Sequence, residues 1–128
     1  FSVLAFALFI TACKKDETPS QTKTEMLTAK FWKIISYSNN DSIIYPEDCE
    51  KDDFLKFYTN GKYDFNPGTI KCYPTDSIDN DIWAFSTDEK ILILDGGDSM
   101  TIFEFTSSKL LIGWSDATET VKITLNSF

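Results

Sequence analysis

The segment Thr120-Val121-Lys122-Ile123-Thr124-Leu125-Asn126 alternates apolar and polar side chains without a break. Val121, Ile123 and Leu125 fall on one face of an extended chain, and the residues between them fall on the other. This period of two is typical of a β-strand, because successive side chains point to opposite sides of a sheet. One apolar face and one polar face indicate an antiparallel sheet with one side in water.

Segments of the same kind recur along the chain. Leu110, Ile112 and Trp114 alternate in the same way, and so do Thr101, Phe103 and Phe105. We expect strands over 31–37, 53–58, 62–65, 82–86, 91–94, 101–105, 110–114 and 120–126. Short strands joined by tight turns, with no long helix between them, predict an all-β fold: a barrel or sandwich of about eight antiparallel strands. A small up-and-down barrel is favoured, because it leaves no sheet edge unpaired.

Asn60-Gly61 is the strongest hairpin signal in the chain. Both central residues of a type I′ turn need positive φ, which asparagine and glycine adopt most readily. The pair therefore predicts a tight hairpin between the strands over 53–58 and 62–65.

The first ten residues are apolar and lead into Ile10-Thr11-Ala12-Cys13 and then Lys14-Lys15-Asp16-Glu17. About ten apolar residues are too few to span a bilayer as a helix, but they match the central part of a secretory signal. The cysteine after two small residues resembles the lipobox of bacterial lipoproteins. That resemblance implies a diacylglycerol on the sulfur of Cys13 and fatty acyl chains, such as palmitate, that anchor the protein to a membrane.

Three segments are expected on this basis. Residues 1–12 form a signal peptide that is incomplete at its N-terminus, since no basic region precedes the apolar run. Residues 13–23 form a lipidated tether, because the stretch after Cys13 has no apolar side chain to bury. Residues 24–128 form the barrel domain, which begins with one short helical turn over 24–29.

Cys49 and Cys72 remain as a pair once Cys13 is assigned to the lipid. Cysteine pairs in exported proteins are usually structural, so we expect a disulfide. Closing this loop would stabilise the fold by roughly 3 kcal/mol on the chain-entropy estimate. The alternative is a thiol nucleophile or a pair of metal ligands, although the chain has no histidine to serve as base or co-ligand.

The order of several segments resembles the lipocalin-like domain found in lipoproteins of the Bacteroidota. The similarity runs from about Glu25 to Leu125 and rests on Leu27-Thr28-Ala29-Lys30-Phe31-Trp32-Lys33, Asp48-Cys49-Glu50-Lys51-Asp52-Asp53, Phe57-Tyr58-Thr59-Asn60-Gly61-Lys62-Tyr63, Cys72, Trp83-Ala84-Phe85-Ser86 and Ile91-Leu92-Ile93-Leu94. This resemblance implies a small antiparallel, lipocalin-like barrel. Lys15-Asp16-Glu17 also resembles the surface-export signal of that phylum, and a solvated charged tether is the alternative interpretation.

Aromatic residues make up 15% of the chain and supply the candidate ligand-binding side chains. These are Trp32, Phe57, Phe65, Trp83, Phe85, Phe103, Phe105 and Trp114. They would suit a concave, mainly apolar pocket. A barrel of about eight strands is also just narrow enough to be filled by its own side chains. The aromatic residues therefore line a cavity or form the core, and the sequence leaves both open.

The formal net charge of −8 arises from 20 acidic and 12 basic residues, all of the latter lysine. An acidic surface repels phosphate backbones, so we expect no nucleic-acid partner. Without histidine, Ser-His-Asp and Cys-His arrangements are excluded, and we expect no catalytic residues and no cofactor. The acidic stretches at 47–53 and 76–81 lack the glycine and glutamate positions of a calcium loop, so no metal site is expected.

Two functions follow as expectations. The first is a lipid-anchored outer-membrane lipoprotein whose barrel binds a small apolar or amphipathic ligand. The resemblance of Lys15-Asp16-Glu17 to an export signal implies exposure at the cell surface. The second is a non-catalytic structural or interaction lipoprotein with a filled barrel that docks an envelope protein. True lipocalins usually carry Gly-x-Trp, and Lys30 stands where that glycine would precede Trp32, which favours the second.

Overall fold

Nine antiparallel strands and one short helix make up residues 21–128, the part of the chain that this computed structural model describes. The elements are α1 (Lys23–Thr28), β1 (Phe31–Asn39), β2 (Ser42–Ile44), β3 (Phe54–Phe57), β4 (Lys62–Asn66), β5 (Asp79–Phe85), β6 (Ile91–Leu94), β7 (Asp98–Phe105), β8 (Lys109–Ser115) and β9 (Thr120–Ser127). The expected all-β class and the short helix are confirmed. The predicted signal peptide, Cys13 and the Lys15-Asp16-Glu17 signal lie outside the described residues.

The strands form one sheet that closes on itself. Their order is β2-β1-β3-β4-β5-β6-β7-β8-β9, and β1 also pairs with β9. Trp32 lies opposite Ser127 at one end of this closing pair, and Asn39 lies opposite Val121 at the other. From β3 to β9 each strand pairs with the next strand in the sequence, and among the described strands β2 pairs only with β1. The fold is therefore the expected up-and-down barrel.

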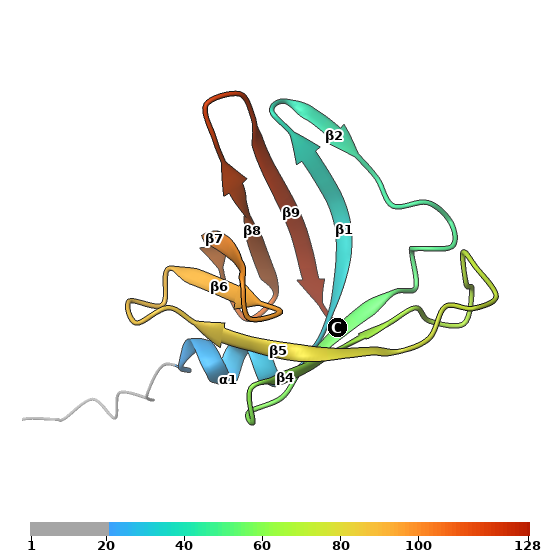
Figure 1. Cartoon of the computed structure of the whole chain (residues 1–128), viewed down its shortest axis with the longest axis horizontal. Helices are drawn as coiled ribbons and strands as arrows, with labels where there is room; N and C mark the ends of the chain where they lie inside the picture. The colour runs from blue at the N-terminus through green and yellow to red at the C-terminus, as the bar shows by residue number, and fades with distance from the viewer. Residues whose placement is uncertain (1–20) are drawn as a thin grey trace, which may run out of the picture.

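The ring is closed at one end and open at the other. Along one edge of β1, the first residues pair with β3 and the last residues pair with β2. The strands β3, β4 and β6 are short, whereas β1, β8 and β9 extend well beyond them (Figure 1). The inner faces of these long strands are therefore left partly uncovered at the open end.

The helix α1 lies across the closed end of the ring (Figure 1). Thr22 caps it by accepting a hydrogen bond from the Glu25 amide, and the Glu25 side chain accepts one from the Thr22 amide. This capping box explains why so short a helix forms at all. The helix begins at Lys23, so the boundary expected between tether and domain falls within its first turn.

Trp32 fastens α1 to the barrel. Its indole Nε1 donates a hydrogen bond of 2.9 Å to the carbonyl of Leu27, and both side chains are fully buried. The ammonium group of Lys56 on β3 donates to the carbonyl of Thr28 at 2.7 Å. These bonds satisfy carbonyl groups at the C-terminal end of the helix that have no partner within it.

The buried core fills the closed half of the barrel. It consists of Leu27, Trp32, Leu55, Phe57, Tyr63, Trp83, Leu92, Leu110, Ile112 and Leu125. The alternation read in the last segment is confirmed, because Leu125 pairs with Leu110 and Ile123 pairs with Ile112 on the inner face.

Two bulges reverse the alternation of side chains within a strand. In β7 the register shifts between Ile102 and Glu104, so Phe103 is an extra residue. Phe105 consequently packs inward, while Phe103 stays 40% exposed under the ammonium group of Lys122 on the outer face. The expected single face for Thr101, Phe103 and Phe105 is therefore wrong. A bulge changes which face each later residue occupies, and alternation alone does not show where it lies.

The bulge in β1 has the same effect. The register shifts between Ile34 and Ser36, which leaves Ile35 as the extra residue with 40% of its side chain exposed. Tyr37 then lies opposite Ile123, on the inner face.

The hairpin at Asn60-Gly61 forms, but its turn differs from the predicted type. Only Gly61 has a positive φ, of 81°, and its amide donates to the carbonyl of Tyr58. This is a three-residue loop in which a type I turn precedes a left-handed residue. Both central residues have positive φ at Asp95-Gly96 instead, between β6 and β7.

The hairpin of β1 and β2 was missed by the sequence analysis. Asn40 turns the chain with a φ of 53°, which asparagine tolerates better than most residues, and its side chain accepts a hydrogen bond from the Thr120 amide. All three residues of β2 are exposed. Ile43 and Ile44 are consecutive and do not alternate with polar residues, so period two gives no signal for this strand.

Gly113 is expected to be indispensable for the pairing of β8 and β9. A Cβ atom at this position would overlap the backbone carbonyl of Val121. Gly113→Ala should therefore lower the free energy of unfolding by about 1–3 kcal/mol, measured by urea denaturation. Gly97→Ala is the matched control, since a Cβ there meets open space. Equal stability of the two variants would contradict this account.

Candidate functional site

Most of the predicted ligand-binding aromatic residues form the closed-end core. Ring centroids lie 6.0 Å apart in Phe57–Trp83, 5.3 Å in Trp83–Phe85, 6.4 Å in Phe85–Phe105 and 6.1 Å in Trp32–Phe105. These five side chains therefore form a continuous chain of contacts across the interior. They pack on one another, and none of the five lines the hollows described below.

The other three predicted residues lie elsewhere. Phe65 on β4 and Trp114 on β8 reach the open end, where both line hollows. Phe103 lies on the outer face, because the bulge in β7 turns its side chain away from the interior. Of the eight candidates, Phe65 and Trp114 therefore line hollows, and Phe103 lies apart from them.

Phe65 lies at the centre of the hollowed region. A hollow of about 380 Å³ is bounded by Phe65 together with Glu50, Asp53, Asp76 and Asp79. A second of about 350 Å³ shares Phe65 and Asp79 with the first and reaches Tyr63, Asp81 and Asp95. A smaller one of about 90 Å³ continues from Phe65 to Ile34 and Tyr37 on β1. The shared residues make these hollows neighbouring parts of one concave region.

An apolar wall faces the open end from the long strands. We define it as Tyr37, Val121, Ile123 and Trp114, which the register places on the inner face of β1, β9 and β8. The first three are only partly buried, and Trp114 is 39% exposed. Trp114 also lines a hollow of about 470 Å³ with Asp98 and Met100. Exposed apolar groups grouped on a concave face mark binding sites more often than scattered ones do.

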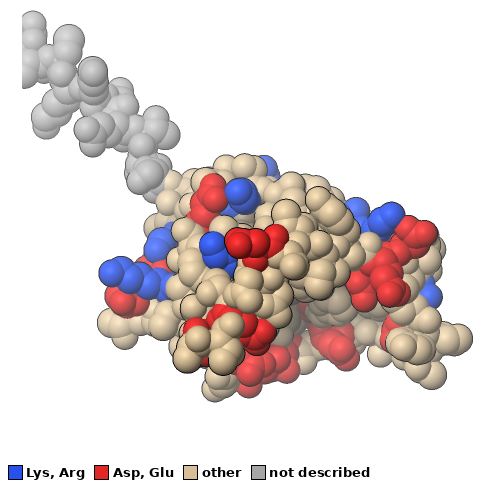
Figure 2. All heavy atoms as spheres, turned by 90° about the horizontal axis from the view of Figure 1, so that it is seen from above, with Lys and Arg blue, Asp and Glu red and all other residues tan. Residues whose placement is uncertain are grey.

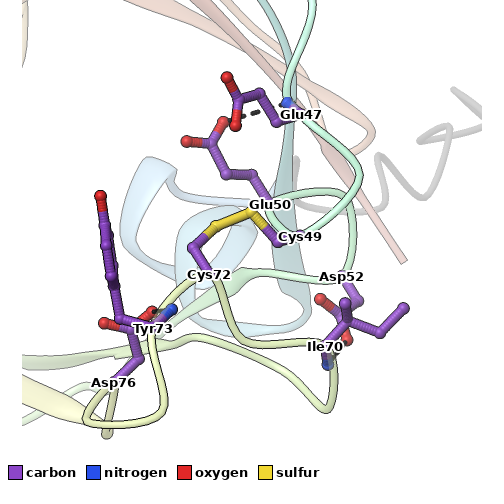
Figure 3. The surroundings of a disulfide bond; sticks show 8 residues. All are labelled: Glu47, Cys49, Glu50, Asp52, Ile70, Cys72, Tyr73 and Asp76. Carbon is purple, nitrogen blue, oxygen red and sulfur yellow. Dashed lines mark hydrogen bonds between the residues drawn. A yellow bond between two sulfur atoms is a disulfide. The ribbon is translucent and has the colours of Figure 1, made fainter.

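The predicted disulfide is present and builds one side of the region. Cys49 precedes β3 and Cys72 lies in the loop between β4 and β5, with Cα atoms 5.0 Å apart. Figure 3 shows the bond joining the loop that carries Glu50 to the loop that carries Tyr73 and Asp76. The bond therefore holds two acidic segments, far apart in the sequence, around the same hollow.

Hydrogen bonds fix both loops. The Asp52 carboxylate accepts from the amide of Thr69 at 2.7 Å and from that of Ile70 at 2.9 Å. Figure 3 shows Asp52 beside Ile70. These bonds lower the pKa of Asp52, the Ile70 amide being the largest cause. The Tyr73 amide donates to Asp76 at 2.9 Å. Carboxylates that accept backbone hydrogen bonds in this way hold irregular loops in one conformation.

Carboxylates dominate the walls of these hollows. They are Glu50, Asp53, Asp76, Asp79, Asp81, Asp95 and Asp98. No lysine of residues 21–128 belongs to the same walls, and the ion pairs found in this range, Lys51–Asp48 and Lys109–Glu104, lie elsewhere. Acidic side chains gather at the lower centre of Figure 2, which views the molecule from above.

Among these carboxylates, Asp53 has a raised pKa. Burial, together with the neighbouring carboxylates of Asp52, Glu50 and Asp76, raises the pKa of Asp53 to about 6. Its Oδ1 atom is buried and accepts no hydrogen bond from the described residues. A carboxylate held among others without a donor is disfavoured in its charged form.

Tyr63 closes the floor of the second hollow. Its hydroxyl donates a hydrogen bond to Asp95, in the turn between β6 and β7. Burial is the largest cause of the raised pKa of Tyr63, and the hydrogen bond to Asp95 is the second. The phenol therefore remains protonated and fixes the Asp95 side chain against the barrel.

The acidic stretches at 47–53 and 76–81 were not placed in a site from the sequence. The available signal was Asp79 and Asp81, which alternate in register with Trp83 and so share its inward face. Within residues 21–128, no group of three cysteine, aspartate or glutamate side chains is arranged to hold a metal ion. Nor does this range contain a helix long and apolar enough to cross a membrane.

Comparison with known proteins supports the fold alone. No protein-family model matches the chain, and no curated protein matches it. The structure is similar to that of an uncharacterized protein from Bacteroides eggerthii DSM 20697, with a TM-score of 0.52 and 10% sequence identity. The similarity covers 77% of this chain and 98% of that chain.

Asp53→Asn is expected to change how stability depends on pH. Because the pKa of Asp53 is raised from 3.8 to about 6, the wild-type fold binds this proton more tightly than the unfolded chain does. Its free energy of unfolding should therefore fall as pH rises from about 4 to 6 and stay lower above that. The variant should lack this fall and be about 1–2 kcal/mol more stable at pH 8, after allowance for solvent screening.

The measurement is urea denaturation of both proteins across this pH range. Asp64→Asn, on the outer face of β4, serves as the control for the change in net charge. Parallel pH profiles for the wild type and Asp53→Asn would show that Asp53 carries no such cost.

Proposed function

We propose that this protein is a non-catalytic binding lipoprotein that holds a small amphipathic ligand at the open end of its barrel. The observation that carries the proposal is the apolar wall of Tyr37, Val121, Ile123 and Trp114, which faces the hollows around Phe65. In a small domain, leaving aromatic and branched side chains exposed on a concave surface gives up the free energy of burying them. A bound ligand would recover it.

The size of the hollows suits a small molecule. Those around Phe65 measure about 380 and 350 Å³, within the range of known ligand pockets, which begins at about 300 Å³. The closed half of the barrel is occupied by the aromatic chain from Phe57 to Trp32. Binding at the mouth therefore requires no rearrangement of the core.

Membrane attachment is part of the proposal. The segment Ile10-Thr11-Ala12-Cys13 resembles a lipobox, which would place acyl chains on Cys13 and the domain at the outer membrane. In the described residues the chain enters the barrel through α1, at the closed end (Figure 1). An anchor upstream of α1 would thus be attached at the end opposite the mouth. A ligand could then reach the mouth from solution.

A protein-docking lipoprotein is the second candidate. The observation that favours it is the edge strand β2, where Ile43 is 61% exposed, Ile44 58% and the following Tyr45 70%. On its outer edge β2 pairs with no other strand of residues 21–128. Exposed apolar edge strands are sites where a strand of another protein can add. Such a lipoprotein would use its outer edge and leave the mouth empty.

Trp114→Ser is expected to weaken binding of a neutral apolar probe. N-phenyl-1-naphthylamine should bind the wild-type chain with enhanced fluorescence, and the variant should bind it about tenfold more weakly, because the apolar wall loses its largest side chain. Phe103→Ser is the matched control. Phe103 is 40% exposed and Trp114 39%, but Phe103 lies on the outer face.

Two outcomes would overturn the binding proposal. Equal weakening by both variants would place the probe on general apolar surface, and no binding to the wild type would leave the mouth without a ligand. The second outcome would favour the protein-docking candidate.

Cys13→Ala is expected to abolish labelling by a fatty-acid analogue and to release the protein from the membrane fraction. The reason is that the Cys13 thiol is the proposed site of acylation, and its alanine variant has no nucleophile there. Labelling and fractionation of the Cys49→Ser/Cys72→Ser variant provide the control, which should remain attached. Continued attachment of Cys13→Ala would show that the anchor is elsewhere.

A further inference from the structure

We propose that the ligand held at the mouth is an organic cation, an amine with an apolar body. The inference rests on the proposed binding function and names the chemistry of the molecule that binds. The structure provides an apolar surface on β1, β8 and β9 and a charged surface around Phe65. The two meet where Tyr37 lines one hollow with Phe65, Glu50 and Asp53. An amphipathic cation is complementary to both.

The apolar side of the region is continuous. Trp114 pairs with Val121 across β8 and β9, and Tyr37 pairs with Ile123 across β1 and β9. Directly opposed side chains on one face of an antiparallel pair lie within contact distance. These residues therefore form one surface on which a hydrocarbon or aromatic body can lie.

The charged side is formed by the hollows around Phe65. Glu50 and Asp53 enter from the loop before β3, Asp76 from the loop before β5, and Asp79 and Asp81 from β5 itself. Asp79 and Asp81 lie opposite Phe65 and Tyr63 in the register, so aromatic faces and carboxylates alternate around the same space. An ammonium group is attracted both by carboxylates and by the faces of aromatic rings.

Three lysines on β1, β3 and β9 lie over aromatic rings outside the hollows. Lys33 lies over the ring of Phe128 at 4.8 Å, Lys56 over Phe31 at 5.3 Å and Lys122 over Phe103 at 5.0 Å. Each occupies the outer face of its strand. Within the described chain, the carboxylates of the mouth therefore have no lysine among the walls to neutralise them, and a cationic ligand would supply the missing charge.

The shape of the region favours an organic cation over other positively charged partners. A metal ion would need several carboxylates converging on one point, and no such group of three exists in residues 21–128. A basic protein would leave the apolar wall without a matching surface, since its charges lie on flexible hydrated side chains. The buried Oδ1 of Asp53, which accepts no hydrogen bond from the described residues, would accept one from an ammonium donor.

Competition among three ligands of equal chain length tests the proposal. Decylamine, decanol and decanoate differ in head-group charge and share the same apolar body. Each is titrated against N-phenyl-1-naphthylamine bound to the full wild-type chain, below the concentration at which micelles form. We expect decylamine to displace the probe at a concentration about tenfold lower than decanol, and decanoate to be the weakest competitor.

Two variants of equal net charge separate local recognition from general attraction. Asp79→Asn/Asp81→Asn removes two carboxylates from the mouth, and Asp64→Asn/Glu104→Gln removes two from the outer face. The first should lower the preference for decylamine over decanol at least several-fold, because Asp79 and Asp81 line the hollows. The second should retain the preference, because its lost charges lie outside the hollows.

The outcomes distinguish this inference from the proposed function. Equal displacement by decylamine and decanol from a wild type that binds the probe would overturn the cationic ligand and leave the binding function standing. Failure of the probe itself to bind would overturn both. Loss of the preference in both double variants would show that it arises from net charge and would also overturn the inference.

Discussion

The pairing of β1 with β9 is the constraint on which the rest of the structure depends. It closes the sheet and so decides which side of every strand is interior. The opposite edge of β1 is divided between β3 at one end and β2 at the other, and so the ring is tightly closed only where β3 pairs. A filled core beneath α1 and an open concave mouth are both consequences of this divided edge.

The disulfide and the mouth illustrate a balance between stability and function. The bond spans 23 residues and stabilises the fold by roughly 3 kcal/mol on the chain-entropy estimate. Burial and the neighbouring Asp52 are the largest causes of the raised pKa of Asp53, and the bond adds to them by holding Glu50 and Asp76 close by. Groups whose pKa values are perturbed in a hollow occur often at functional sites. A cationic ligand would relieve this repulsion, so the mouth would be more stable when occupied.

Sequence reasoning identified the elements that have a strong local signal. The alternation in the last strand, the helical turn before Phe31 and the Asn60-Gly61 hairpin all depend on side chains close together in the chain. The bulges at Ile35 and Phe103 carried no such signal, and each reverses the faces of the residues after it. For that reason Phe103 was expected on the same face as Phe105, whereas the structure places it on the outer face.

By itself, the sequence determined the all-β class and the antiparallel order, because both follow from local patterning. It predicted the disulfide of Cys49 and Cys72 on the premise that Cys13 carries a lipid, and it left a thiol nucleophile or metal ligands as the alternative. Only the tertiary structure decided that five aromatic side chains pack on one another at the closed end. It also decided that two acidic segments meet at the mouth. Both arrangements arise from ring closure, which brings together residues that are distant in the chain and have no local signal of their proximity.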